Sequence, residues 1–414
     1  MQGGKAIESG SYGCVFRPPL KCKHKSRPKK GVSKLLLKKH ADKEMSETRT
    51  IYKLMKRYPS MKSYILIPNE DNPCQPDTLT ATDLIDFDKK CNNFLKLNMQ
   101  SNRINKYIKD LGILQLEYGG EELVNYINQF PWKKRHVEVV HKGLTDIMEH
   151  VIIPMNQNGL YHSDIKNNNI MIHKERLKLI DFGLTFQHDP TTIHSSYLNK
   201  YIDILIPYSV ILFNDSIPYK WTEFYKKHKT LSKVKFIQAA SKHIIFVYKQ
   251  SNPSPSDREI ELLNYTNFIF GYQVNSLELL ANHIAICYYN YKNPITGEFE
   301  ALNYYNEEFV PLIDIWGILV IYLESVDHLT RSTSCQQYCN SIKHLLKKHM
   351  FSIHKGRIDY NHFLKDLKEL LHRKHHPMVH GQNNSSSRKS NRKTKRIMKH
   401  QYLVPKTKKR RYIK

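Results

Sequence analysis

The chain has 414 residues, enough for one large domain or for two to three of average size. Its hydrophobic share of 40% can supply a core, which argues against global disorder. The formal net charge of +27, from 65 Lys and Arg against 38 Asp and Glu, predicts attraction to polyanions: nucleic acid, anionic membrane, acidic protein or nucleotide phosphate.

The first predicted elements are a strand, a turn and a second strand over residues 5–16, then a strand over 32–37. Between them a basic stretch begins at Arg17 and continues to Lys43. Residues 41–58 predict a helix that ends at Tyr58-Pro59, because apolar side chains recur on one face. Residues 68–110 are polar and weakly patterned, and we interpret them as an insertion.

The next predicted elements are a strand over 113–118, a helix over 137–155 and short strands over 170–172 and 177–180. Residues 184–305 give no clear assignment. An apolar helix is expected over 310–323 and further helix over 341–371. The tail, 373–414, has 15 Lys and Arg and no Asp or Glu, and we expect it to be disordered.

No apolar run is long enough for a signal peptide or a membrane-spanning helix, so no membrane span is expected. The seven cysteines are odd in number and irregularly spaced, which predicts reduced thiols in the cytoplasm or nucleus rather than a disulfide framework. Cys22 with His24, and Cys335 with Cys339, lack a second half at metal-finger spacing. The seven are Cys14, Cys22, Cys74, Cys91, Cys287, Cys335 and Cys339.

A candidate phosphate-binding loop lies between the first two predicted strands. Two of its glycines would let the backbone approach phosphates and donate N–H groups, although a plain hairpin turn explains the same residues. Its residues are Ile7, Glu8, Ser9, Gly10, Ser11, Tyr12, Gly13, Cys14 and Val15.

A stronger signal is His162-Ser163-Asp164-Ile165-Lys166-Asn167-Asn168-Asn169, followed by Leu179-Ile180-Asp181-Phe182-Gly183. Asp164 can accept a hydrogen bond from a substrate hydroxyl, and Lys166 can neutralise charge on a transferred phosphate. Asn169 and Asp181 offer the oxygen ligands that Mg²⁺ prefers. Each residue alone could belong to an ordinary turn, but the combination predicts phosphoryl transfer.

This segment resembles the catalytic and magnesium-binding loops of the eukaryotic protein kinase superfamily, over about residues 5–187 and 305–371. The resemblance implies an α+β fold with a small β-rich N-lobe (about 1–118) and a larger α-helical C-lobe (about 119–372), an insertion at about 200–305 and a separate tail. It also implies ATP and Mg²⁺ in the cleft. The long insertion, the early basic loop and the tail resemble divergent kinases of large DNA viruses, which implies a host-cell or virion location.

The resemblance assigns further roles. Lys34 is the phosphate-positioning lysine, with Lys38 and Lys39 as rivals, and Glu47 is its expected ion-pair partner, with Glu44 as the alternative. The hinge that would hold adenine contains Glu117 and Tyr118, with Leu116 as gatekeeper. Asp314, inside an apolar helix, is expected to be buried and to anchor the catalytic loop.

Three departures from the family pattern are visible. Glu8 stands where the family has its first glycine, which adds negative charge near the phosphates. Ser163 replaces the arginine that usually binds an activating phosphate, so we expect activity without phosphorylation of the segment that follows Gly183. Ile206-Pro207-Tyr208 is a poor match to Ala-Pro-Glu, and the usual Glu–Arg pair is then missing.

The sequence therefore predicts a kinase that transfers the γ-phosphate of ATP to serine or threonine of proteins. A pseudokinase scaffold and a small-molecule kinase of related fold are alternatives. Basic surfaces suggest acidic protein substrates, and the tail could contact nucleic acid or an import receptor.

Overall fold

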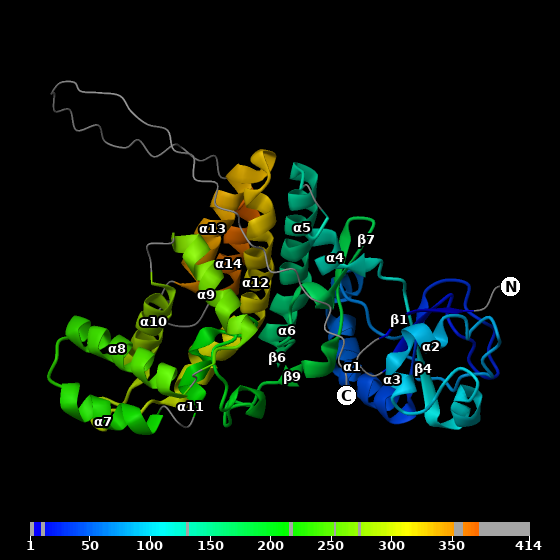
Figure 1. The fold of residues 1–414 in the computed structure, drawn as a ribbon, viewed down its shortest axis with the longest axis horizontal. Helices are drawn as coiled ribbons and strands as arrows, with labels where there is room; N and C mark the ends of the chain where they lie inside the picture. Colours follow the sequence, from blue (N-terminus) through cyan, green and yellow to red (C-terminus); the bar gives the residue numbers. More distant parts are fainter. Residues whose placement is uncertain are drawn as a thin grey trace. The chain divides into compact units, whose positions relative to one another are not determined.

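The computed structural model describes residues 4–9, 13–129, 132–214, 218–251, 254–271, 275–351 and 359–371. One compact unit extends from Met1 to Arg373, and the remaining unit, 374–414, lies outside the described residues together with the predicted basic tail. The fold is mixed α+β, with a small antiparallel sheet in the N-terminal region and a helical C-terminal region, as Figure 1 shows.

The N-terminal sheet has four antiparallel strands in the order β1-β2-β3-β4. The two strands predicted within 5–16 are confirmed as β1 and β2, while the turn between them lies outside the described residues. The strand predicted at 32–37 is confirmed as β3, and the strand predicted at 113–118 is β4, which begins and ends two residues earlier. In register, Val15 of β2 lies opposite Lys34 of β3, which lies opposite Leu114 of β4. The strands are β1 (Lys5–Ser9), β2 (Gly13–Arg17), β3 (Val32–Leu37) and β4 (Leu111–Leu116).

Helix α1 (Lys38–Arg57) follows β3 without a linker, so the predicted helix is confirmed and begins three residues earlier. Its buried face has helical spacing, and the helix ends at Arg57, directly before Tyr58-Pro59, because Pro59 lacks the N–H needed to continue it. The buried side chains are Ala41, Met45, Thr48, Ile51 and Leu54.

Residues 68–110, expected to be an unpatterned insertion, supply a second apolar core for the sheet. Short helices α2 (Phe87–Lys90) and α3 (Asn92–Leu95) place the Phe87 ring against Phe16 of β2 and the Phe94 ring against Phe87. Two disulfide bonds, Cys14–Cys91 and Cys22–Cys74, join this segment to β2 and to the loop after it. The expectation of reduced thiols is therefore wrong for these four cysteines, because spacing along the chain does not report pairs formed by long-range folding.

The helical region is built around α5, α6 and α12. The predicted helix at 137–155 is confirmed as α5 and α6, joined by a π-helical turn at Met148–Ile152. The predicted apolar helix is confirmed as α12. Further helices are α4 (Leu123–Ile127), α5 (Lys134–Ile147), α6 (Ile153–Gln157), α11 (Ala301–Tyr304), α12 (Val310–Thr330), α13 (Gln336–Met350) and α14 (Tyr360–Glu369).

Two small antiparallel sheets hold the loops that carry the predicted catalytic residues. β5 (Glu121–Glu122) pairs with β7 (Ile170–His173), which pairs with β8 (Arg176–Leu179), and β6 (Leu160–Tyr161) pairs with β9 (Phe186–Gln187). The predicted strands at 170–172 and 177–180 are thus confirmed.

Residues 200–305 belong to the range that the sequence left unassigned, and their described part contains four α-helices before α11. They are α7 (Pro218–His228), α8 (Lys233–Ser251), α9 (Asp257–Phe270) and α10 (Ser276–Tyr291). Aromatic side chains join them: Phe236 of α8 lies 5.4 Å from the Phe224 ring of α7 and 6.2 Å from the Tyr288 ring of α10.

Within the described residues, one helical stretch, Ala301–Thr330, is long and apolar enough to cross a membrane. The rest of the fold buries 89% of its most apolar window, as in the core helix of a folded domain, so the stretch is weak support for a span.

Candidate active site

A cavity of about 450 Å³ lies between the N-terminal sheet and the loops that carry the predicted chemistry. Gly10, Ser11 and Tyr12 lie outside the described residues, while Cys14 faces the opposite side of the sheet in its disulfide. The predicted site residues that line the cavity are Ile7, Glu8, Ser9, Val15, Lys34, Glu47, Glu117, Tyr118, Lys166, Asn169 and Asp181.

Gly13 has a packing role in the sheet. A Cβ atom at this position would lie 2.2 Å from the carbonyl oxygen of Leu35, so only glycine permits the observed approach of β2 to β3. This contact holds the strand that carries Val15 against the strand that carries Lys34.

Lys34 forms an ion pair with Glu44, whose Oε2 lies 2.6 Å from Nζ. The expected partner, Glu47, instead lies 3.6 Å from Lys43, so the alternative was correct and the first choice was wrong. The reason is the direct β3–α1 junction, which brings the second turn of α1, rather than the third, over Lys34. Burial raises the pKa of Glu47, Lys43 opposes this rise, and Asp181 adds to it.

Asp164 accepts hydrogen bonds from the two other predicted residues of the catalytic loop, Lys166 and Asn169. The Lys166 ammonium donates to both carboxylate oxygens of Asp164 at 2.8 Å, and the Asn169 amide nitrogen donates to Oδ2 at 2.7 Å. Asn169 also donates to the Asp164 backbone carbonyl at 2.8 Å, which closes the loop on itself. Three of the predicted residues therefore share one hydrogen-bonded constellation.

Asp314 of α12 anchors this loop from beneath. It is buried, as expected, and its two oxygens accept the backbone N–H groups of His162 at 3.0 Å and Ser163 at 2.9 Å. Burial raises the pKa of Asp314 and lowers that of His162. Ser163 has a φ of 59°, so these bonds also stabilise an unfavourable backbone conformation. Gly317, one turn later, permits close contact with Ile165.

The Asp181-Phe182-Gly183 turn lies at the cavity wall. Asp181 has a φ of 61°, and its Oδ1 accepts the Gly183 N–H at 3.4 Å. Phe182 is buried with its ring 4.9 Å from that of His162, so the turn and the catalytic loop support each other.

Asn169 and Asp181 fit a magnesium ion bound jointly with phosphates. The Asn169 amide nitrogen already donates to Asp164, which leaves its oxygen as the coordinating atom, and the Asp181 carboxylate lines the same cavity. Among the described residues no group of three or more His, Cys, Asp and Glu side chains could hold a metal without such help.

The hinge candidates lie at the far wall of the cavity. The Glu117 carboxylate is 2.7 Å from Lys178, whose hydrogen bond lowers the pKa of Glu117. The Arg17 guanidinium lies 3.5 Å from the centre of the Tyr118 ring. The side chains of Glu117 and Tyr118 therefore contact Lys178 and Arg17, and we expect the hinge to contact a base through its backbone. Gly120 has a φ of +90°, and a Cβ there would meet the Ile172 carbonyl at 1.9 Å.

Sequence reasoning missed Glu122, which lines the cavity and accepts a 2.9 Å hydrogen bond from Asn168. Burial, and then Glu122, raise the pKa of Glu8. The only sequence signal was a pair of glutamates after Gly119-Gly120; the pairing of β5 with β7 is what brings Glu122 to the site.

The segment after Gly183 is fixed by side chains other than an arginine–phosphate pair. The Ser163 hydroxyl donates to the Leu184 carbonyl at 2.6 Å. Tyr208, in the poorly matching Ile206-Pro207-Tyr208, is buried with its ring 5.3 Å from that of Trp316, and its hydroxyl donates to the Met350 carbonyl at 2.8 Å.

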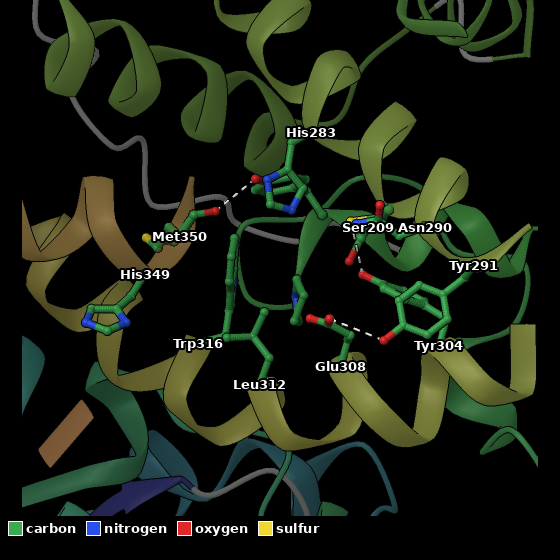
Figure 2. A pocket seen from close by; sticks show the side chains of 13 residues that line it. Ser209, His283, Asn290, Tyr291, Tyr304, Glu308, Leu312, Trp316, His349 and Met350 are labelled. Carbon is green, nitrogen blue, oxygen red and sulfur yellow. Dashed lines mark hydrogen bonds between the residues drawn. The ribbon is translucent and has the colours of Figure 1, made fainter. Parts of the chain in front are cut away.

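Figure 2 shows a second cavity, where α10 meets α12. His283, Asn290 and Tyr291 of α10 face Glu308, Leu312 and Trp316 across it, and the Tyr291 hydroxyl donates to Glu308 at 3.2 Å. Its volume of about 30 Å³ holds water and excludes a nucleotide. The larger cavity is therefore the candidate active site.

Comparison with models of protein families and with curated proteins finds no match to this chain. The class defined by the fold is mixed α+β, and the kinase resemblance stays a prediction.

Proposed function

We propose that the protein is an ATP- and magnesium-dependent protein kinase that phosphorylates serine or threonine. The observation that carries the proposal is the constellation in which Asp164 binds Lys166 and Asn169, beside a cavity lined by Lys34 and Asp181. A phosphate-positioning cation, a carboxylate for the acceptor hydroxyl and oxygen ligands for a metal are the parts that phosphoryl transfer requires.

In this proposal Lys34, oriented by Glu44, holds the phosphates of ATP, and the hinge backbone next to Tyr118 contacts the base. Asp164 accepts the proton of the acceptor hydroxyl. The hydroxyl oxygen forms a bond to the γ-phosphorus while the bond from that phosphorus to the bridging oxygen breaks, and ADP leaves with the electron pair. Lys166 neutralises charge on the transferred group.

Asn169 and Asp181 would hold Mg²⁺. The bound ion would supply charge neutralisation on the phosphates. The chain's own contribution is to orient these two ligands, through Asp164 for Asn169 and through the left-handed turn for Asp181.

The test is transfer of labelled γ-phosphate to mixed protein substrates by the native chain and by Asp164→Ala. We expect phosphoserine or phosphothreonine from the native chain and near-complete loss in the variant. Transfer only to small molecules would favour a small-molecule kinase. Absence of transfer by a folded native chain that binds ATP would favour a pseudokinase.

A further inference from the structure

Helix α8, in the insertion, carries a basic stripe on its exposed face. Residues 218–251 contain eight Lys, no Arg and one acidic residue, Glu223. On α8 the exposed residues Lys235, Lys242, Phe246 and Lys249 follow one another at helical steps of seven, four and three, so they lie on one face. We call these four residues the α8 stripe.

The opposite face of α8 packs into the protein interior. Phe236, Ala240, Ile244, Val247 and Tyr248 are buried. Figure 1 shows α8 beside α7 and α10, and ring contacts from Phe236 to both helices agree with this arrangement. The helix is thus a rigid support whose outward face is fixed by its packing.

The stripe has no counter-charge among the described residues: none of its three lysines forms an ion pair there. Between Lys242 and Lys249, Phe246 is 58% exposed, so an aromatic ring lies within the row of lysines. The stripe covers about 21 Å from Lys235 to Lys249 at the helical rise of 1.5 Å per residue. A partner that satisfies these features is an extended polyanion with apolar, planar groups.

We propose that the α8 stripe binds single-stranded nucleic acid, with the lysines on phosphates and the Phe246 ring stacked on a base. Exposed aromatic rings within a cationic track are the usual means of holding single strands, because only unpaired bases offer their faces. A membrane is a poorer partner, since the apolar face of α8 is buried and its large exposed apolar side chains, Val234 and Phe246, lie twelve residues apart. This surface is separate from the proposed kinase site and does not depend on it.

The test uses the full chain, so that any binding by the tail is common to all variants. The probe is a fluorescent oligothymidine of about 16 nucleotides, near the upper limit for one site. Affinity is measured over a range of salt concentrations for the native chain, K235A/K242A/K249A, F246A, and a control, K53A/K96A/K109A, that removes three exposed lysines elsewhere. Circular dichroism checks folding of each variant.

We expect the stripe variant to lower the slope of log affinity against log salt by about 2, because each phosphate that a lysine no longer neutralises reduces the slope by about 0.7. We expect F246A to weaken binding about 5- to 150-fold with the slope unchanged, the range for removing the stacking of one base. A photoreactive oligothymidine should crosslink to the peptide that contains Phe246.

Three results would overturn the proposal. The stripe variant and the control could show the same slope. F246A could bind as tightly as the native chain, which would reduce the stripe to a general polyanion surface. The stripe substitutions could abolish binding to vesicles of phosphatidylserine and phosphatidylcholine while oligothymidine binding is unchanged, which would assign the surface to a membrane.

Discussion

The two disulfide bonds of the N-terminal region give the most quantitative prediction. Cys14 and Cys91 are separated by 77 positions in the sequence, and Cys22 and Cys74 by 52. In the chain-entropy description, a cross-link stabilises the fold because it removes conformations from the unfolded chain, and its contribution grows with the logarithm of the enclosed length. These lengths give about 4.5 kcal/mol for the first bond and about 4 kcal/mol for the second.

The perturbation is C14A/C91A, compared with the native chain by urea denaturation under non-reducing conditions. We expect the free energy of unfolding to fall by about 3.5 kcal/mol rather than about 4.5 kcal/mol, because the retained Cys22–Cys74 bond lies inside the loop that Cys14–Cys91 closes and already shortens it. Dithiothreitol should lower the stability of the native chain further than that of the variant, because the variant retains only one bond to reduce.

Alkylation of the denatured, unreduced native chain counts its free thiols. Only Cys287, Cys335 and Cys339 should react. Reaction at all seven cysteines, or a native stability that does not respond to dithiothreitol, would refute the assignment of these bonds and the stability attributed to them.

Three other predictions concern the candidate site and its support. Glu44→Gln should lower the rate of phosphoryl transfer at least tenfold, because it removes a charge-assisted hydrogen bond to Lys34 worth about 1.5 kcal/mol. Glu47→Gln should lower the rate less, because Glu47 pairs with Lys43. A larger loss for Glu47→Gln than for Glu44→Gln in steady-state kinetics would contradict the observed pairing. Gly317→Ala should destabilise the fold by about 1–3 kcal/mol, because the added Cβ would lie 2.6 Å from the Ile165 carbonyl oxygen of the catalytic loop. An unchanged or higher midpoint of urea denaturation would show that the loop can move aside. Burial raises the pKa of Glu324 to about 7, so the folded state keeps a proton that the unfolded chain releases near 4.5, and the free energy of unfolding should decrease as pH rises between these values. Glu324→Gln should remove this part of the pH dependence, and equal pH profiles for native and variant chains would argue against it.

The residues of the catalytic loop could be predicted because they are close in sequence. Asp164, Lys166 and Asn169 lie within six residues, so a short irregular loop is sufficient to bring their side chains together. The burial of Asp314 could also be predicted, since a carboxylate within a long apolar helix has no polar face to occupy.

Contacts between residues that are far apart along the chain depended on the tertiary structure. The choice between Glu44 and Glu47 depended on the rotation of α1 relative to β3, which the missing linker determines. Glu122 reached the site only through strand pairing.

The sequence by itself determined the strands and helices that have a clear apolar period, such as β3, α1 and α12, because that period reports local backbone geometry. It also carried the loop chemistry on which the kinase proposal rests. Only the tertiary structure decided the cysteine pairs, the second core beneath the sheet and the outward face of α8, because each depends on contacts between distant segments that no local periodicity encodes.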